Sequence, residues 1–201
     1  MAAPGTASES MAPRTARVGV FAAALALGAF NLGSYWYLKR ASADFVVAGR
    51  TADAPPYQVG TVVPWNRPSS AALFGWSRPE AAGTWTDARV AALAFRLPGR
   101  PEQDLVLTAD VIAFVDPQRL PVRHVDVFVN GAPAAEWRLE HDRPTQRTVP
   151  VIRGLIQGDG VVRVEFRFRE VHSPAELGTG PDTRLLSMML LQWRLDPSTG
   201  G

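Results

Sequence analysis

Val162-Arg163-Val164-Glu165-Phe166-Arg167-Phe168-Arg169-Glu170 (VRVEFRFRE) is the stretch that decides the fold of this 201-residue chain. Apolar and charged side chains alternate along it without a break. Because successive side chains of a β-strand point to opposite faces, this alternation predicts a half-buried strand with one face in water.

A second pattern predicts a β-hairpin. Residues Val122–Val129 alternate, with Val125, Val127 and Val129 on the inward face. The dipeptide Asn130-Gly131 follows and leads into the apolar-rich Ala134–Leu139. Asn-Gly suits the tight turns that join antiparallel strands, so these segments are expected to pair.

The remaining strand candidates complete an all-β pattern. Leu105–Val115 and Leu185–Leu191 are apolar on nearly both faces, which predicts central strands covered on two sides. Weaker candidates are Tyr57–Val63, Ala88–Leu97 and Gln146–Ile152. Short strands separated by Pro, Gly and Asp favour an all-β, antiparallel β-sandwich of jelly-roll-like type.

Composition excludes several classes of function. The chain has no Cys, so disulfides, thiolate nucleophiles and thiolate metal sites are absent. The first 43 residues carry four basic groups against Glu9, a balance of +3, whereas residues 44–201 carry 17 basic and 18 acidic groups, a balance of −1. Basic side chains are interspersed with acidic ones and form no stripe, so nucleic acid is not an expected partner.

An uncharged run of 21 residues, Val18–Leu38, lies between Arg17 and Lys39. A helix rises about 1.5 Å per residue, so this run is long enough to cross the roughly 30 Å apolar core of a bilayer. The predicted membrane anchor includes Val18, Leu25, Phe30, Trp36 and Leu38.

Two alternatives to this anchor remain open. A buried core helix would show a polar face, and none occurs before Asn31. A cleaved signal peptide is the stronger alternative because Ala41-Ser42-Ala43 has the small-x-small form of a cleavage site. The apolar run is longer than a usual signal peptide, and Lys39 and Arg40 precede the site, which favours an uncleaved anchor.

Five regions follow from these patterns. Residues 1–17 are expected to be a disordered cytoplasmic tail and 18–38 a transmembrane signal-anchor helix. Residues 39–56 are a linker and first strand, 57–197 the β-sandwich, and 198–201 a flexible tail. Charge flanks the anchor on both sides and does not fix its orientation. A short tail of small residues suits the cytoplasm, which puts the β domain on the outer, periplasmic side of a bacterial inner membrane.

Three sequence blocks stand out: GWSRPEAAGTWT at 75–86, VFVNG at 127–131 and SPAELGTGPDTR at 173–184. In this order they resemble an uncharacterised β-sandwich domain of bacterial cell-envelope proteins, often attached to or encoded beside membrane glycosyltransferases. The resemblance covers about residues 70–195. Ala88 and Ser187 stand where the pattern has Gly, and His124 where it has Gln. The resemblance implies an envelope location and a connection to glycans, and it carries over no catalytic residue.

The candidate glycan-binding residues are Trp76, Glu80, Trp85, Asp182 and Arg184. An aromatic ring packs on the C–H face of a sugar while carboxylates and guanidinium groups bind its hydroxyls. The competing interpretation is structural: the tryptophans pack in the interior, and the carboxylates pair with Arg184 to join two loops.

Patterns for catalysis and metal binding are weak. Ser77 and Ser173 lack the context of a nucleophile, and Glu80 with Asp182 is a glycosidase pair only at the right separation. The three histidines are far apart in sequence, so no metal and no cofactor are expected. The leading hypothesis is a non-catalytic accessory protein that binds glycan or assists a glycan-synthesising membrane enzyme. The alternatives are a purely structural subunit of a membrane complex and, more distantly, a glycoside hydrolase.

Overall fold

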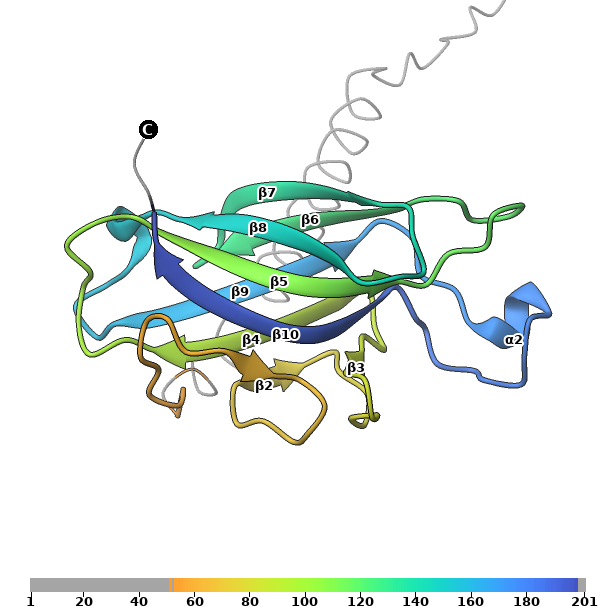
Figure 1. Cartoon of the computed structure of the whole chain (residues 1–201), viewed down its shortest axis with the longest axis horizontal. Helices are drawn as coiled ribbons and strands as arrows, with labels where there is room; N and C mark the ends of the chain where they lie inside the picture. Colours follow the sequence, from red (N-terminus) through yellow and green to blue (C-terminus); the bar gives the residue numbers. More distant parts are fainter. Residues whose placement is uncertain (1–50, 52, 199–201) are drawn as a thin grey trace, which may run out of the picture. The chain divides into compact units, whose positions relative to one another are not determined.

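The structure is a computed structural model, and it describes residues 51 and 53–198. These residues form two antiparallel five-stranded sheets, so the all-β antiparallel sandwich is confirmed (Figure 1). The strands are β1 (Val63–Pro64), β2 (Ala72–Phe74), β3 (Thr84–Trp85), β4 (Val90–Arg96), β5 (Leu105–Ala113), β6 (Arg123–Val129), β7 (Ala132–Leu139), β8 (Thr145–Val151), β9 (Val161–Phe168) and β10 (Met188–Pro197). A 3₁₀ turn, η1 (Arg153–Leu155), and a short helix, α2 (Pro174–Leu177), lie in loops.

Strands that follow one another in the sequence mostly lie in different sheets. One sheet runs β2-β4-β9-β6-β7, and the other runs β1-β10-β5-β8 with β3 also paired to β10. Of the eight strands β3 to β10, β3, β5, β8 and β10 lie in one sheet and β4, β6, β7 and β9 in the other, and only the hairpin β6–β7 keeps two consecutive strands together. This is the arrangement of a jelly roll, in which two Greek keys interlock. Every edge strand of the second sheet except β8 is short, which limits the exposed backbone.

The alternating stretch that opened the sequence analysis lies at the centre of its sheet. It forms β9, which pairs with β4 on one side and β6 on the other. Its Val162, Val164 and Phe166 are fully buried, whereas Arg167 is exposed. The predicted half-buried strand is confirmed.

The predicted hairpin is also confirmed. Strands β6 and β7 are antiparallel, and the turn between them has φ of 48° at Asn130 and 85° at Gly131. Two successive residues in the left-handed region are what a type I′ turn requires. The Asn130 side chain holds the turn by donating to the carbonyls of Leu155 and Val161 and accepting from the amide of Arg163.

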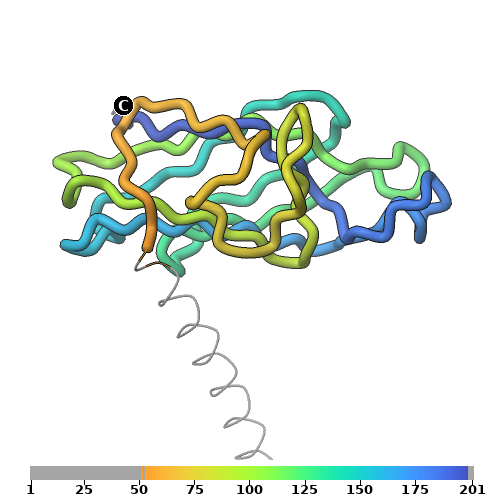
Figure 2. Tube along the Cα trace, turned by 90° about the horizontal axis from the view of Figure 1, so that it is seen from below, coloured from red at the N-terminus to blue at the C-terminus, as the bar shows by residue number. Residues whose placement is uncertain are grey.

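One predicted strand is wrong. Residues Tyr57–Val63 mostly cross from one sheet to the other: Pro56 bridges Arg96 of β4, and the amide of Gly60 donates to Leu195 O of β10 at 2.8 Å (Figure 2). Only Val63 and Pro64 pair as a strand. Before them, the Tyr57 ring is buried between the sheets and its hydroxyl donates to Thr61 O, which holds the segment in a turn.

The expectation of burial on both faces is wrong for Leu105–Val115 and right for most of Leu185–Leu191. In β5 buried residues alternate with half-buried ones, whereas Leu186–Leu190 are buried at every position and burial alternates again in the rest of β10. No described layer covers the outer face of this sheet, so Thr108, Asp110 and Gln192 meet solvent there. Apolar outward residues such as Val106 and Ile112 gave the misleading pattern.

A continuous chain of aromatic rings fills the core. Tyr57 and Phe95 stack on Trp193 with centroids 4.9 and 4.8 Å away. Trp65 contacts both Trp193 and Trp76. Phe166 in turn contacts Trp76 and Trp137. The core therefore extends to the loop between β2 and β3, where Trp76 lies.

No helix in the described part of the chain has the length and apolar character needed to cross a bilayer. The predicted anchor, Val18–Leu38, lies outside the described residues.

Candidate functional site

The first sequence block folds as a narrow hairpin-like loop between β2 and β4. Trp76 bridges Thr86, the amide of Ser77 donates to Trp85 O at 2.9 Å, and the amide of Glu80 donates to Gly83 O at 2.7 Å. Directly paired residues share a face and successive residues alternate, so Trp76 and Thr86 share one face and Trp85 lies on the other.

The two tryptophans predicted to form one sugar-binding surface are therefore separated. Trp76 packs against Trp65 and Phe166, with ring centroids 5.3 and 6.1 Å away. Trp85 instead meets Phe114 at 6.2 Å. Each is half-buried, and their opposite orientations across the loop rule out a shared flat platform.

The predicted polar residues do come together, around Arg184. Its guanidinium donates to Glu80 Oε1 at 2.9 Å, to Asp182 Oδ2 at 2.6 Å and to Ser77 Oγ at 3.1 Å. We call Ser77, Glu80, Asp182 and Arg184 the Arg184 clasp. It joins the 75–86 loop to the segment that leads into β10, which agrees with the structural interpretation of these residues.

The clasp has electrostatic consequences. Hydrogen bonds and charge from Arg184 hold the pKa of Asp182 below its usual value, and the two carboxylates raise the pKa of Arg184. A glycosidase acid needs a carboxyl pKa raised toward neutrality. The shift at Asp182 has the opposite sign, so this carboxyl stays ionised and bound to Arg184.

A cavity of about 310 Å³ lies beside the clasp. We call it the Trp65–Trp76 pocket. Its apolar lining comes from Trp65, Pro68, Ala72, Leu73, Phe74, Trp76 and Pro79, and its polar lining from Arg67, Ser69, Ser77, Arg78 and Thr84. The volume lies at the lower end of the range of about 300–1,000 Å³ that is typical of small-molecule sites.

Backbone contacts fix the position of Trp65 in this pocket. Its amide donates to Leu191 O of β10 at 2.8 Å, and its carbonyl accepts from the hydroxyl of Thr84. Trp65 follows β1 directly and Thr84 begins β3, and both short strands pair with the same side of β10. The pocket therefore forms where β1 and β3 meet along that strand.

The position of Trp76 is also fixed by backbone contacts. Its Nε1 donates to Ala92 O of β4 at 2.8 Å. Gly75 before it has φ of 78°, and a Cβ there would lie 2.1 Å from Val90 O. Only glycine permits this close approach, which brings the ring of Trp76 against the core.

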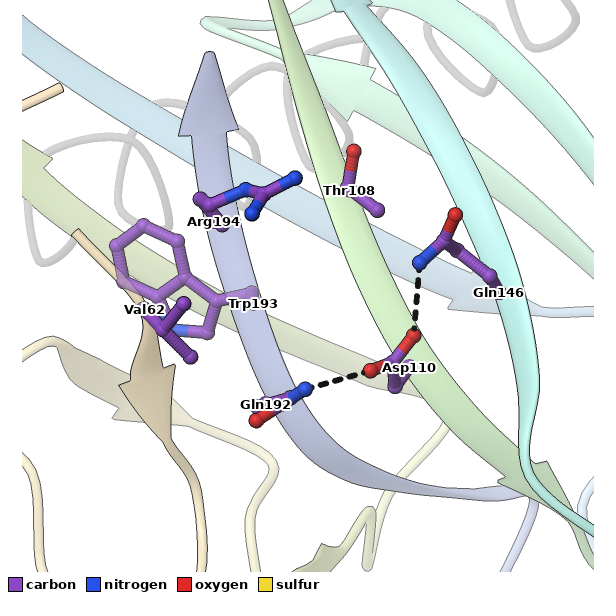
Figure 3. A pocket seen from close by; sticks show the side chains of 7 residues that line it. All are labelled: Val62, Thr108, Asp110, Gln146, Gln192, Trp193 and Arg194. Carbon is purple, nitrogen blue, oxygen red and sulfur yellow. Dashed lines mark hydrogen bonds between the residues drawn. The ribbon is translucent and has the colours of Figure 1, made fainter. Parts of the chain in front are cut away.

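Two further hollows lie on the described part of the domain. On the outer face of the β10-β5-β8 sheet, Asp110 accepts from the side-chain amides of Gln146 at 3.3 Å and Gln192 at 2.7 Å (Figure 3). The hollow beside them measures only about 80 Å³, which is room for a few waters at roughly 30 Å³ each.

The other hollow, of about 390 Å³, lies between Phe114, Asp116 and Leu177. The backbone amides of Gln118 and Arg119 bind Asp116 Oδ1 and lower the pKa of that carboxyl. This hollow has one aromatic side chain, Phe114, and its single acid already has partners.

Sequence reasoning therefore found Trp76 and missed most of the pocket around it. The sequence patterns do not single out Trp65 or Arg67, and Arg78 and Thr84 enter only as part of the 75–86 block. The segment Pro64-Trp65-Asn66-Arg67-Pro68 did hold a signal, since it places a tryptophan and an arginine in a proline-bounded loop.

Within residues 51 and 53–198 no three His, Asp or Glu side chains gather as a metal-binding group. No family model and no curated protein matches the chain.

Solved structures give distant likenesses. The carbohydrate-binding module CBM36 with calcium and xylotriose is 9% identical over 68% of this chain and 99% of its own, with a TM-score of 0.43. A family 35 carbohydrate-binding module from Clostridium thermocellum is 13% identical over 69% and 99%, with a TM-score of 0.42. The insecticidal delta-endotoxin Cry8Ea1 from Bacillus thuringiensis is 10% identical over 54% and 18%, with a TM-score of 0.34.

Proposed function

We propose that this protein is a non-catalytic, extracytoplasmic β-sandwich that binds glycan in the Trp65–Trp76 pocket. The observation that carries the proposal is the pocket itself: two indole rings 5.3 Å apart line a cavity of about 310 Å³ together with hydroxyl and guanidinium groups.

The chemistry of the lining suits a sugar. The half-buried indole ring of Trp76 offers apolar contact to the C–H face of a pyranose, and the buried Trp65 packs behind it. Ser69 and Ser77 present hydroxyls, and Arg67 and Arg78 present planar sets of donors for ring hydroxyls. Trp76 was a predicted glycan contact and keeps that role here, whereas Glu80, Asp182 and Arg184 support the pocket from the clasp.

Pre-organisation favours binding at this place. Trp65 is buried, and Trp76 is fixed by its hydrogen bond to Ala92 O and by its contact with Phe166. A rigid wall loses little conformational entropy when a ligand binds. This favours sugar binding, because desolvation of the sugar hydroxyls already offsets much of the binding free energy.

The membrane anchor belongs to the same proposal. An uncharged run of 21 residues, Val18–Leu38, supports a single-pass inner-membrane protein with its β domain outside. A membrane glycosyltransferase is the proposed partner, on the basis of the sequence resemblance.

The pocket is tested with two matched substitutions in the full-length protein in detergent. Trp76→Phe and Trp137→Phe each remove one indole hydrogen bond to a backbone carbonyl, at 2.8 and 3.0 Å, and each side chain packs on Phe166. Only Trp76 lines the pocket. On a glycan array, Trp76→Phe is expected to weaken binding while Trp137→Phe binds as the wild type does. Equal binding by all three proteins, or no binding by any, would contradict the proposal.

The anchor is tested by fractionation. Full-length protein is expected to stay with membranes after alkaline carbonate washing, and external protease is expected to digest the β domain in spheroplasts. Release into the aqueous fraction with an intact N-terminus would contradict the anchor.

A further inference from the structure

The Trp65–Trp76 pocket contains guanidinium groups without partners. Most arginine side chains of the domain bind a carboxylate or a carbonyl, as Arg169 does with Asp126 at 2.8 Å and Arg153 with Glu102 O at 2.6 Å. Among residues 51 and 53–198, four arginine side chains make no hydrogen bond or ion pair: Arg67, Arg78, Arg89 and Arg143. Two of these four, Arg67 and Arg78, line this one pocket.

No acidic side chain lines the pocket to balance them. The acids nearest in sequence are occupied elsewhere. Glu80 binds Arg184 at 2.9 Å, and Asp87 Oδ1 accepts the amide of Leu185 at 2.9 Å. The pocket therefore carries two uncompensated positive charges beside an aromatic wall, in a domain whose total charge is close to zero.

We propose that the ligand of this pocket is an anionic saccharide, with its sugar ring against the half-buried Trp76 and its acidic group on Arg67 and Arg78. This inference rests on the proposed function and adds the charge of the glycan. A guanidinium group presents its donors in a planar fork that matches a carboxylate or a phosphate with two parallel hydrogen bonds.

A neutral sugar is expected to bind this pocket more weakly than an anionic one. It would leave the exposed Arg67 and Arg78 without a counter-charge at the rim of the pocket. The acidic group supplies that counter-charge, so affinity is expected to depend on salt, because screening over a Debye length of about 10 Å at 0.1 M weakens such pairs.

The experiment compares each acidic saccharide with its uncharged counterpart by calorimetry on the full-length protein in detergent. One arm uses trigalacturonate and its fully methyl-esterified form, which tests a carboxylate. The other uses maltotriose phosphate and maltotriose, which tests a phosphate. The variant Arg67→Gln/Arg78→Gln removes both charges from the pocket, and Arg89→Gln/Arg143→Gln removes two unpartnered charges from outside it.

At least one acidic form is expected to bind about ten-fold or more tightly than its uncharged counterpart, since a charge-assisted contact contributes roughly 1.5–3 kcal/mol. The preference should shrink at high salt and disappear in the pocket double variant, and it should persist in the control variant. Equal affinity for acidic and uncharged forms, or a preference that survives Arg67→Gln/Arg78→Gln, would overturn the anionic inference and leave glycan binding intact. Failure of every saccharide to bind would overturn both.

Discussion

The indole rings of Trp65 and Trp76 meet edge to face, with centroids 5.3 Å apart and ring planes inclined at 68°. Trp65 is 1% exposed and belongs to the core, whereas Trp76 is half-buried in the loop after β2. The pair therefore connects the interior to the candidate binding pocket. A change at the pocket wall is therefore expected to affect stability as well as binding.

Gly75→Ala is expected to destabilise the domain strongly. A Cβ at Gly75 would lie 2.1 Å from Val90 O and 2.6 Å from Ala91 Cα, and φ is 78° there. The backbone of β4 has to move, so the free energy of unfolding should fall by roughly 3 kcal/mol or more. Gly158→Ala is the control, because nothing lies within 4 Å of a Cβ at that position. Urea denaturation that showed equal losses for both variants would contradict the close approach at Gly75.

Arg184→Gln is expected to loosen the clasp. It removes ion pairs to Glu80 at 2.9 Å and Asp182 at 2.6 Å. The Arg184 side chain is 32% exposed, so solvent screening limits the loss to about 1 kcal/mol. Arg143→Gln, at an exposed arginine without a partner in the described region, should change the melting temperature little. Unchanged stability in Arg184→Gln would show that the clasp does not hold the two loops together.

Acid should remove the stabilisation that the clasp provides. Arg184 lowers the pKa of Asp182 in the folded state, so this contribution is present above the unfolded pKa of about 3.9. It is lost as the pH falls through the lower folded pKa. Thermal melts of wild type and Arg184→Gln should therefore differ at pH 7 and converge once the pH lies below the folded pKa of Asp182. A difference that stays constant over this range would indicate that the Asp182 carboxylate contributes nothing.

The hairpin turn allows backbone conformation to be separated from side-chain hydrogen bonding. Asn130 has φ of 48°, and its side chain binds Leu155 O at 2.8 Å, Val161 O at 3.0 Å and the amide of Arg163 at 2.7 Å. Glycine adopts the positive φ without strain, so Asn130→Gly loses only these hydrogen bonds and should lower the free energy of unfolding by about 1–3 kcal/mol. Asn130→Ala adds conformational strain and should cost more. Equal losses in chemical denaturation would argue against a strained turn.

The sequence was sufficient to predict the parts of the fold that depend on local alternation. Strands β9, β6 and β7 and the Asn130-Gly131 turn follow from side-chain period and turn chemistry, which act over a few residues. Tyr57–Val63 was mistaken for a strand because a segment that crosses between sheets also buries an aromatic residue. Arg123 shows another limit: its position in β6 is inward-facing by period, yet its charge suggests the surface. The structure buries it with Nε bound to Phe114 O, and burial lowers its pKa to about 10.

The site was harder to predict because it depends on contacts distant in sequence. Trp76 and Trp85 lie in one motif, yet the loop turns them to opposite sides. The sequence points to Arg184, Glu80 and Asp182 as candidate residues, but only the three-dimensional arrangement shows that Arg184 forms ion pairs with both carboxylates. Trp65 reaches Trp76 because β1 and β3 both pair with β10, and this is set by topology.

The most direct test of the account is the response of the indole N–H signals in NMR spectra of the full-length protein as an acidic saccharide is added. The account predicts that the signal of Trp76, assigned with Trp76→Phe, shifts in a saturable manner while those of Trp137 and Trp193 stay in place. A Trp76 signal that does not move with a saccharide that binds, or that moves no more than the signal of Trp137, would contradict glycan binding in the Trp65–Trp76 pocket.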